Sequence, residues 1–266
     1  MPFLEFDRYL GTLALPQIFL SGQKKISSGS IAVVGLGGTG GIAAELFARA
    51  GVAELVLIDD DTVSLTNIQR QVEYVEADIG RKKAETLKKR ISAINHTVKV
   101  EVVNERLTGE NASVIGKPSM IFDGTDNFSA RNAINRYAVR NGIPWIMTAA
   151  NETFGTIKAI LPHETSCTAC LGYPDSGNEE IGCAQAGILP SAPVAIGTMA
   201  FSLGLKILMG EKVDGDIVYI DTWNYTVERV RTLINPKCTV CRNFHFKVCQ
   251  HKQSLIGLIA PDQKGN

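Results

Sequence analysis

Apolar and polar positions along the first half of the chain alternate between strand-like and helix-like patterns. Short apolar runs predict strands, and the longer amphipathic segments between them predict helices. The predicted strands are residues 31–34, 54–58, 98–103, 120–122 and 144–148, and the predicted helices are 42–50, 80–94 and 129–140. Strands that alternate with helices of this length indicate a parallel sheet covered by helices on both faces.

The pattern changes after Thr153. A hairpin is followed by a loop, one helix and two more strands at 217–221 and 226–233. We therefore expect an α/β fold with a Rossmann-like doubly wound sheet. The sheet is parallel in its first half and extended by antiparallel strands in its second half.

One segment of the second half carries no charge. The segment from Gln185 to Leu205 contains no Asp, Glu, Lys or Arg, and it is long enough to span a membrane. Several Pro, Gly, Ser and Thr residues weaken its hydrophobicity. They favour a small-residue helix buried in a soluble protein or dimer, started by Pro193 and closed by Gly210. A membrane span is the less favoured alternative.

Composition narrows the class of protein. The 266 residues suit one large domain with additions, and 45% apolar and 20% charged residues exclude global disorder. Lys plus Arg and Asp plus Glu both number 27, so bulk attraction to nucleic acid or acidic lipid is excluded. The N-terminal MPFLEFDRYLG lacks the basic start and apolar run of a signal peptide. We expect a cytoplasmic enzyme that binds neither nucleic acid nor membrane.

A glycine-rich loop lies between the first predicted strand and its helix. It contains Gly35, Gly37, Gly38 and Gly40. Glycines let the backbone approach a phosphate, and a helix N-terminus offers free N–H groups. Asp59 ends the next strand, where a carboxylate can bind ribose hydroxyls. A tight turn alone is the alternative. The loop itself does not distinguish NAD(P) from ATP, because no P-loop Gly-Lys-Ser/Thr is present.

Polar residues downstream favour ATP. Asn67 and Arg70 follow the acidic turn, and Lys83 lies on the next predicted helix. A dehydrogenase has no need for these groups near the phosphates, whereas transfer of a polyphosphate does, because cations stabilise the departing charge. A solvated helix face is the alternative for the Arg-Lys-Lys run.

The sequence Asp123-Gly-Thr-Asp126-Asn127 ends the predicted strand at 120–122. Open α/β sheets bind ligands at this edge. A carboxylate there can bind Mg²⁺ that bridges ATP phosphates. Asp126 and Asn127 are also suited to cap the following helix, and both roles can hold together.

The cysteines form two Cys-x-x-Cys pairs, Cys167 with Cys170 and Cys238 with Cys241. In a reducing compartment this spacing predicts a structural four-thiolate Zn²⁺ site that clips the hairpin to the C-terminal region. A zinc knuckle made of Cys238, Cys241, His245 and Cys249 is the alternative, but it leaves the first pair unexplained. Cys183 lies in a predicted loop, where it is a candidate nucleophile or an inert thiol.

Together these motifs resemble the ThiF/MoeB/HesA family, relatives of ubiquitin-activating enzymes. Within that family, the motifs are most similar to those of the molybdopterin-synthase adenylyltransferases. The resemblance runs from about Arg8 to Cys241. It includes the glycine loop, Asp59 with Asp61, the Asn-x-x-Arg-Gln of 67–71, Lys83, the 123–127 motif, both cysteine pairs and the Cys-x-x-Ala-Gly of 183–187.

The resemblance implies an ATP-dependent adenylyltransferase. Its substrate would be the C-terminal Gly-Gly carboxylate of a ubiquitin-like (β-grasp) sulfur carrier, serving molybdopterin, thiamine or thiolated-tRNA synthesis. By motif, Asp59 would bind ribose, Asn67, Arg70 and Lys83 the phosphates, and Asp126 Mg²⁺. Cys183 matches a position that in some relatives takes a persulfide or an acyl bond to the carrier.

One departure concerns the N-terminal family motif Arg-Tyr-x-Arg-Gln, whose second arginine reaches the ATP of the other subunit of a homodimer. Gly11 stands at that arginine's position, and Arg8 is a candidate to replace it. Two other functions follow as alternatives. One is an activating enzyme that forms a Cys183 thioester for protein conjugation. The other is a weakly catalytic nucleotide-binding subunit that needs a partner.

We expect a single adenylating domain over residues 1–266. Its parts are a nucleotide-binding half (1–150), a carrier-binding half with the zinc site (151–241) and a C-terminal tail (242–266). No rhodanese-like domain follows Cys241, so a separate sulfurtransferase or cysteine desulfurase would supply sulfur.

Overall fold

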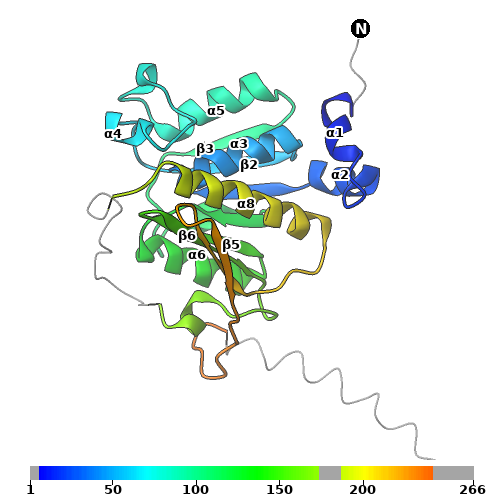
Figure 1. Cartoon of the computed structure of the whole chain (residues 1–266), viewed down its shortest axis with the longest axis vertical. Coiled ribbons are helices and arrows are strands. Elements are labelled where there is room, and N and C mark those ends of the chain that lie inside the picture. Colours follow the sequence, from blue (N-terminus) through cyan, green and yellow to red (C-terminus); the bar gives the residue numbers. More distant parts are fainter. Residues whose placement is uncertain (1–5, 174–186, 242–266) are drawn as a thin grey trace, which may run out of the picture.

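The computed structural model describes residues 6–173 and 187–241. Within these ranges one eight-stranded sheet has the order β3-β2-β1-β4-β5-β6-β7-β8 and carries helices on both faces (Figure 1). The strands are β1 Ser30–Val34, β2 Glu54–Ile58, β3 Lys99–Val103, β4 Met120–Asp123, β5 Trp145–Asn151, β6 Phe154–Ile160, β7 Ile217–Asp221 and β8 Thr226–Val230.

The helices fall into longer α-helices and short 3₁₀ turns. The α-helices are α1 Leu10–Leu13, α2 Phe19–Ser27, α3 Gly40–Ala50, α4 Leu65–Ile68, α5 Lys83–Ile94, α6 Phe128–Asn141 and α8 Ser191–Met209. The 3₁₀ turns are η1 Asp7–Tyr9, η2 Glu76–Asp78, η3 Ala112–Ile115 and η4 Thr168–Leu171.

Strands β3, β2, β1, β4 and β5 are parallel. In register, Val34 at the end of β1 pairs with Ile58 of β2 and with Asp123 of β4, so three strands end at one level. Helices α3 and α5 pack on one face and α6 on the other (Figure 1). The chain reverses its direction of travel across the sheet between β1 and β4, which is where open sheets bind ligands.

The second half of the sheet is antiparallel. Strand β5 pairs with β6, β6 with β7, and β7 with β8. The long helix α8 lies across β5 and β6 and against α3 (Figure 1). A Cβ atom on Gly197 would lie 2.6 Å from the Thr39 carbonyl oxygen, so only glycine allows this close approach to the start of α3.

Among the described helices, α8 alone is long and apolar enough to cross a membrane by length and composition. Its apolar residues instead cover the sheet, where Ile196 and Ala200 are fully buried. The helix starts at Ser191, two residues before the predicted Pro193, and ends at the predicted Gly210.

Two apolar cores flank the sheet. One fills the space under α3, α5 and α8 and includes Phe47 and Leu87. The other lies under α6 and includes Trp145 together with Cys167, Cys238 and Cys241. The predicted doubly wound sheet with an antiparallel extension is therefore confirmed.

The boundaries differ from the prediction at a few points. The helix expected from Gly80 begins at Lys83 because Gly80 has a left-handed φ of +83°. The strand expected over 226–233 ends at Val230. The N-terminal helices α1 and α2 were not predicted, although α2 is amphipathic and buries Ile26.

Candidate active site and cysteine cluster

The glycine-rich loop turns sharply between β1 and α3. Gly35 has a φ of +80°, in the left-handed region that favours glycine. A Cβ atom on Gly40 would lie 1.9 Å from the Gly35 carbonyl oxygen, and one on Gly124 would lie 2.6 Å from it. The loops after β1 and β4 therefore approach each other backbone to backbone at the reversal of strand order.

A cavity of about 670 Å³ opens beside these loops at the carboxyl ends of the strands. It brings together most of the residues predicted for nucleotide binding. Those that line it are Gly35, Gly37, Gly38, Asp59, Asp61, Arg70, Lys83, Asp126 and Asn127.

Asp59 is fixed by backbone donors at the end of β2. Its two carboxylate oxygens accept hydrogen bonds from the N–H groups of Leu36 (2.6 Å) and Asp61 (2.8 Å). Burial raises the pKa of Asp59, while the Lys83 ammonium and these N–H groups oppose the rise. The carboxylate thus ties the glycine loop to the acidic turn and faces the cavity, as a ribose-binding group would.

Lys83 is almost completely buried, and its ammonium forms a 2.8 Å ion pair with Asp61. Arg70 is half-buried and donates to the Thr66 carbonyl oxygen at 2.9 Å. Both cations line the same cavity wall. The cavity therefore has two positive groups near the glycine loop, where polyphosphate oxygens would lie.

In the motif after β4, two polar residues make structural contacts and one is exposed to the cavity. Asp123 is buried and forms a 2.8 Å ion pair with Arg131 of α6, a residue that the sequence analysis missed. Asn127 caps α6, since its Oδ1 accepts from the Ala130 N–H at 2.9 Å. Asp126 is exposed and lines the cavity, and no described residue forms an ion pair or hydrogen bond with its carboxylate. An exposed carboxylate among groups predicted to bind phosphate fits a Mg²⁺ ligand.

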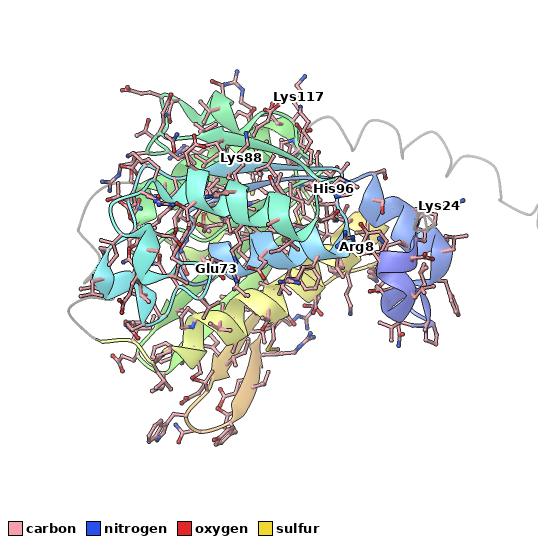
Figure 2. The ribbon with its side chains drawn as sticks, turned by 90° about the horizontal axis from the view of Figure 1, so that it is seen from above. Arg8, Lys24, Glu73, Lys88, His96 and Lys117 are labelled. Carbon is pink, nitrogen blue, oxygen red and sulfur yellow. The ribbon has the colours of Figure 1, made fainter. Side chains whose placement is uncertain are left out.

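Three predicted residues do not line the cavity. Gly40 lies beneath the loop, and the Asn67 side-chain oxygen accepts from the Ser64 N–H at 3.2 Å in a capping box. Arg8 donates to the Ile94 carbonyl oxygen at 2.8 Å, at the far end of α5 and beside His96 (Figure 2). Within its own chain Arg8 is therefore distant from the nucleotide cavity.

Some polar groups of this region were not predicted. Gln71 Oε1 and Asn151 Oδ1 are buried, have no hydrogen-bond partner among the described residues, and belong to residues that line the cavity. Gln71 is part of the Asn-x-x-Arg-Gln motif, so that motif was the signal available for it. Asn151 at the end of β5 has no sequence signal of its own.

Glu73 is a buried acid that the sequence analysis did not single out. It is 1% exposed, and neither carboxylate oxygen has a partner among other described residues. Burial raises its pKa from the ordinary 4.5 to about 8. It lies where α3 and α5 are neighbours (Figure 2) and packs against Gly41.

The four paired cysteines form a compact cluster at the other end of β6. Sγ–Sγ separations are 3.8 Å for Cys167–Cys170, 3.7 Å for Cys167–Cys238, 3.8 Å for Cys170–Cys241 and 3.3 Å for Cys167–Cys241. A tetrahedral Zn²⁺ with bonds of about 2.3 Å places sulfurs about 3.8 Å apart. All four thiols are free of disulfides. The donor set therefore fits Zn²⁺ and agrees with the four-cysteine prediction.

Two further sequence predictions fall outside the described residues. They are the candidate nucleophile Cys183 and the alternative zinc knuckle that uses His245 and Cys249.

Residues 9–241 match the model of the ThiF family. The chain therefore belongs to the ThiF family, as the motif resemblance implied.

Individual relatives agree along nearly the whole chain. A sulfur carrier protein adenylyltransferase of Thermus thermophilus is 33% identical, over 89% of this chain and 91% of the relative. A SAMP-activating enzyme E1 of Haloferax volcanii is 33% identical, over 89% of both chains. A molybdopterin-synthase adenylyltransferase of Salmonella typhimurium is 32% identical, over 89% of this chain and 96% of the relative.

The fold also matches a crystal structure of E. coli MccB with MccA-N7isoASN. The TM-score is 0.78 at 19% identity, and the match covers 90% of this chain and 75% of the other. At this identity the likeness concerns the fold alone.

Proposed function

We propose that this chain uses ATP to adenylate the C-terminal Gly-Gly carboxylate of a ubiquitin-like sulfur-carrier protein, with release of pyrophosphate. One observation carries the proposal. Arg70 and Lys83 lie in the same cavity as the glycine loop, the ribose-type Asp59 and the free carboxylate of Asp126. A dinucleotide enzyme has no use for that set of charges, whereas a reaction that expels pyrophosphate does.

The reaction needs positioning more than a protein nucleophile. A carboxylate oxygen of the carrier attacks the α-phosphorus of ATP, and the bond from that phosphorus to the bridging oxygen breaks, so that the electron pair leaves with pyrophosphate. Lys83 and Arg70 stabilise the charge on the departing oxygens, and Asp59 holds the ribose. Asp126 would hold Mg²⁺, which supplies further charge neutralisation between phosphates.

Asn67 and Arg8 have weaker support within one chain. The oxygen of the Asn67 side chain is used in a helix cap, which leaves its amide nitrogen as the group for a phosphate. Arg8 would have to act on the cavity of a second copy, in place of the arginine that Gly11 lacks. Asn127 supports the site by capping α6 next to Asp126.

The carrier would dock on the antiparallel strands. Thr156 lines the cavity and pairs in register with Tyr219, which pairs with Glu228, so a continuous face leads from the cavity across β6, β7 and β8. Tyr219 is 41% exposed, and the hairpin tip presents Trp223 and Tyr225 at 66% and 92% exposure. Exposed aromatic groups of this kind are typical of protein interfaces.

This arrangement supports the division into a nucleotide-binding half (1–150), a carrier-binding half (151–241) and a tail (242–266) within one adenylating domain. We further propose a cytoplasmic location and a separate sulfurtransferase or cysteine desulfurase as sulfur source. The balanced charge speaks against nucleic acid as a partner.

A homodimer is part of the proposal. Large apolar side chains are exposed in two sets, one near the N-terminus and one around α4. The first set is Leu10, Leu15, Phe19 and Leu20, and the second is Leu65, Val72, Val75 and Ile79. In a two-fold dimer each set of one copy can cover the other set of its partner. That contact would also bring Arg8 of each chain towards the other chain's cavity.

Pyrophosphate–ATP exchange with a panel of Gly-Gly carriers tests the function. We expect exchange with at least one carrier, and a loss of about 100-fold or more in Asp126→Ala. Asp214→Asn, an exposed carboxylate paired with Arg229, is the matched control and should retain activity. ATP binding without exchange for any carrier would instead indicate the partner-dependent subunit.

A second function is favoured by the SAMP-activating E1 among the relatives. In that case Cys183 would form a thioester with the carrier. The mass of the protein after incubation with carrier and ATP distinguishes the two, because a thioester adds the carrier mass and is removed by a thiol reductant. Cys183→Ser would abolish the adduct and leave the exchange reaction intact.

A further inference from the structure

Lys158 in the middle of β6 is fully buried. Its ammonium donates hydrogen bonds to Ser166 Oγ (3.0 Å), to Thr232 Oγ1 (2.8 Å) and to the Gly215 carbonyl oxygen. These three bonds use all three N–H groups. Every acceptor is electrically neutral, so the positive charge itself is not balanced by any of them.

No described carboxylate forms an ion pair with Lys158. Of the two acids whose charges act on Lys158, Asp214 is more than half exposed and already pairs with Arg229 at 3.0 Å. Asp216 is only partly buried and makes no contact with the ammonium. Burial lowers the pKa of Lys158 to about 8, and the charges of Asp216, Cys170 and Cys167 oppose that shift. Because buried charges in proteins are paired or lie beside ions, a further negative charge nearby would stabilise the ammonium.

The cysteine cluster lies next to Lys158. Ser166, which accepts from the ammonium, directly precedes Cys167, and the fields of Cys167 and Cys170 both act on the lysine. Four thiolates around one Zn²⁺ keep a net charge of about −2. Donors and charges around the sulfurs are the groups that tune such sites.

We propose that Lys158 is the outer cation of the four-thiolate zinc site, positioned by Ser166 and Thr232 to balance part of the negative charge that the bound metal leaves on the sulfurs. This role is independent of the proposed adenylation. Lys158 does not touch the metal. It stabilises the loaded site through its charge, so zinc affinity depends on that charge rather than on the hydrogen bonds alone.

Zinc affinity by chelator competition tests this on the full chain. Lys158→Gln keeps a polar N–H donor on a side chain one bond shorter but removes the charge, and we expect affinity to fall about 10- to 100-fold. Lys158→Arg keeps the charge. Thr232→Val removes one acceptor, and Asp216→Asn removes the carboxylate whose charge acts most strongly on Lys158. These three controls should each stay within about threefold of the native protein.

Cobalt substitution gives a readout other than affinity. Removing the nearby positive charge raises the energy of the sulfur electrons, so the sulfur-to-cobalt charge-transfer band of Lys158→Gln should move to longer wavelength. The bands of Thr232→Val and Asp216→Asn should not move. An unchanged band and affinity in Lys158→Gln would overturn the proposal. So would an equal loss in Thr232→Val or in Asp216→Asn.

A second background covers the case in which Lys158→Gln does not fold. Cys170→His replaces one thiolate by a neutral ligand and reduces the negative charge of the loaded site by one. The effect of Lys158→Gln should then be smaller, or folding should be restored, because the two changes are coupled. An equal effect, or an equal failure to fold, in both backgrounds would mean that the lysine acts only as a structural clamp.

Discussion

The two ends of β6 carry two sites of opposite construction. Near Phe154 lies the nucleotide cavity, which is open and formed by loops after parallel strands. Beyond Ile160 lies the cysteine cluster, which is mostly buried and made by side chains from segments 71 residues apart. In the cavity, the buried cation Lys83 forms an ion pair with Asp61. Lys158, beside the cluster, forms no ion pair with any described carboxylate. The two sites therefore differ in how a buried lysine is balanced.

The largest effect is expected when ligands of the metal are removed. Cys238→Ser combined with Cys241→Ser should abolish zinc binding and lower the thermal midpoint strongly, since structural zinc sites contribute on the order of 10 kcal/mol of binding free energy. Metal content and thermal unfolding are the measurements. Cys183→Ser is the matched control, and a loss of zinc there would contradict the four-cysteine assignment.

A substitution in the cavity should instead lower activity and leave the stability of the protein almost unchanged. Lys83→Met should lower pyrophosphate exchange by about 100- to 1000-fold, the cost of removing one preorganised charge stabiliser. Its thermal midpoint should change little, because the Asp61 left behind is 65% exposed. Lys82→Met, the neighbouring exposed lysine that donates to the Asp60 carbonyl oxygen, is the control. Equal losses in both variants would refute a specific role for Lys83.

Glu73 is an exception on the nucleotide side, because it is buried and its carboxylate has no hydrogen-bond partner among the other described residues. Its folded-state pKa of about 8 lies above the ordinary 4.5, so the folded chain keeps a proton that the unfolded chain releases. The stabilising effect of that proton is complete below about pH 4.5 and is lost as the pH rises to about 8. Urea unfolding of Glu73→Gln should match the native protein near pH 4.5. By about pH 8 the variant should be more stable by up to about 4 kcal/mol. A constant difference across this range would count against the buried-acid interpretation.

The smallest expected effect concerns the exposed hairpin. Trp223→Ala should raise the KM for the carrier about tenfold, or about 1.4 kcal/mol, and leave the KM for ATP unchanged. Leu233→Ala, 70% exposed but outside the hairpin, should leave both constants unchanged. Saturation curves in the exchange assay measure both. A change in the KM for ATP would contradict the assignment of Trp223 to the carrier-binding surface.

The same contrast explains what could be predicted from sequence. The glycine loop, Asp59 and the cysteine pairs are local patterns, and they identified both sites. Buried pairs such as Asp123 with Arg131, and the buried Lys158 with its three neutral acceptors, depend on which side chains meet after folding, so no local pattern indicates them. Helix α8 is a case in which the composition of a segment did not determine its surroundings. Its composition, with Lys206 as its single charged residue, is compatible with lipid, and only its packing against β5, β6 and α3 shows that protein covers one of its faces.

The separation of the two cysteine pairs also orders events during synthesis. A chain is made from its N-terminus, and its early parts fold first. The nucleotide half can therefore form while Cys167 and Cys170 still wait for Cys238 and Cys241, which emerge 71 residues later. All four thiolates can therefore bind a metal only after Cys241 has been made, and a chain that ends before Cys238 has only two of the four ligands.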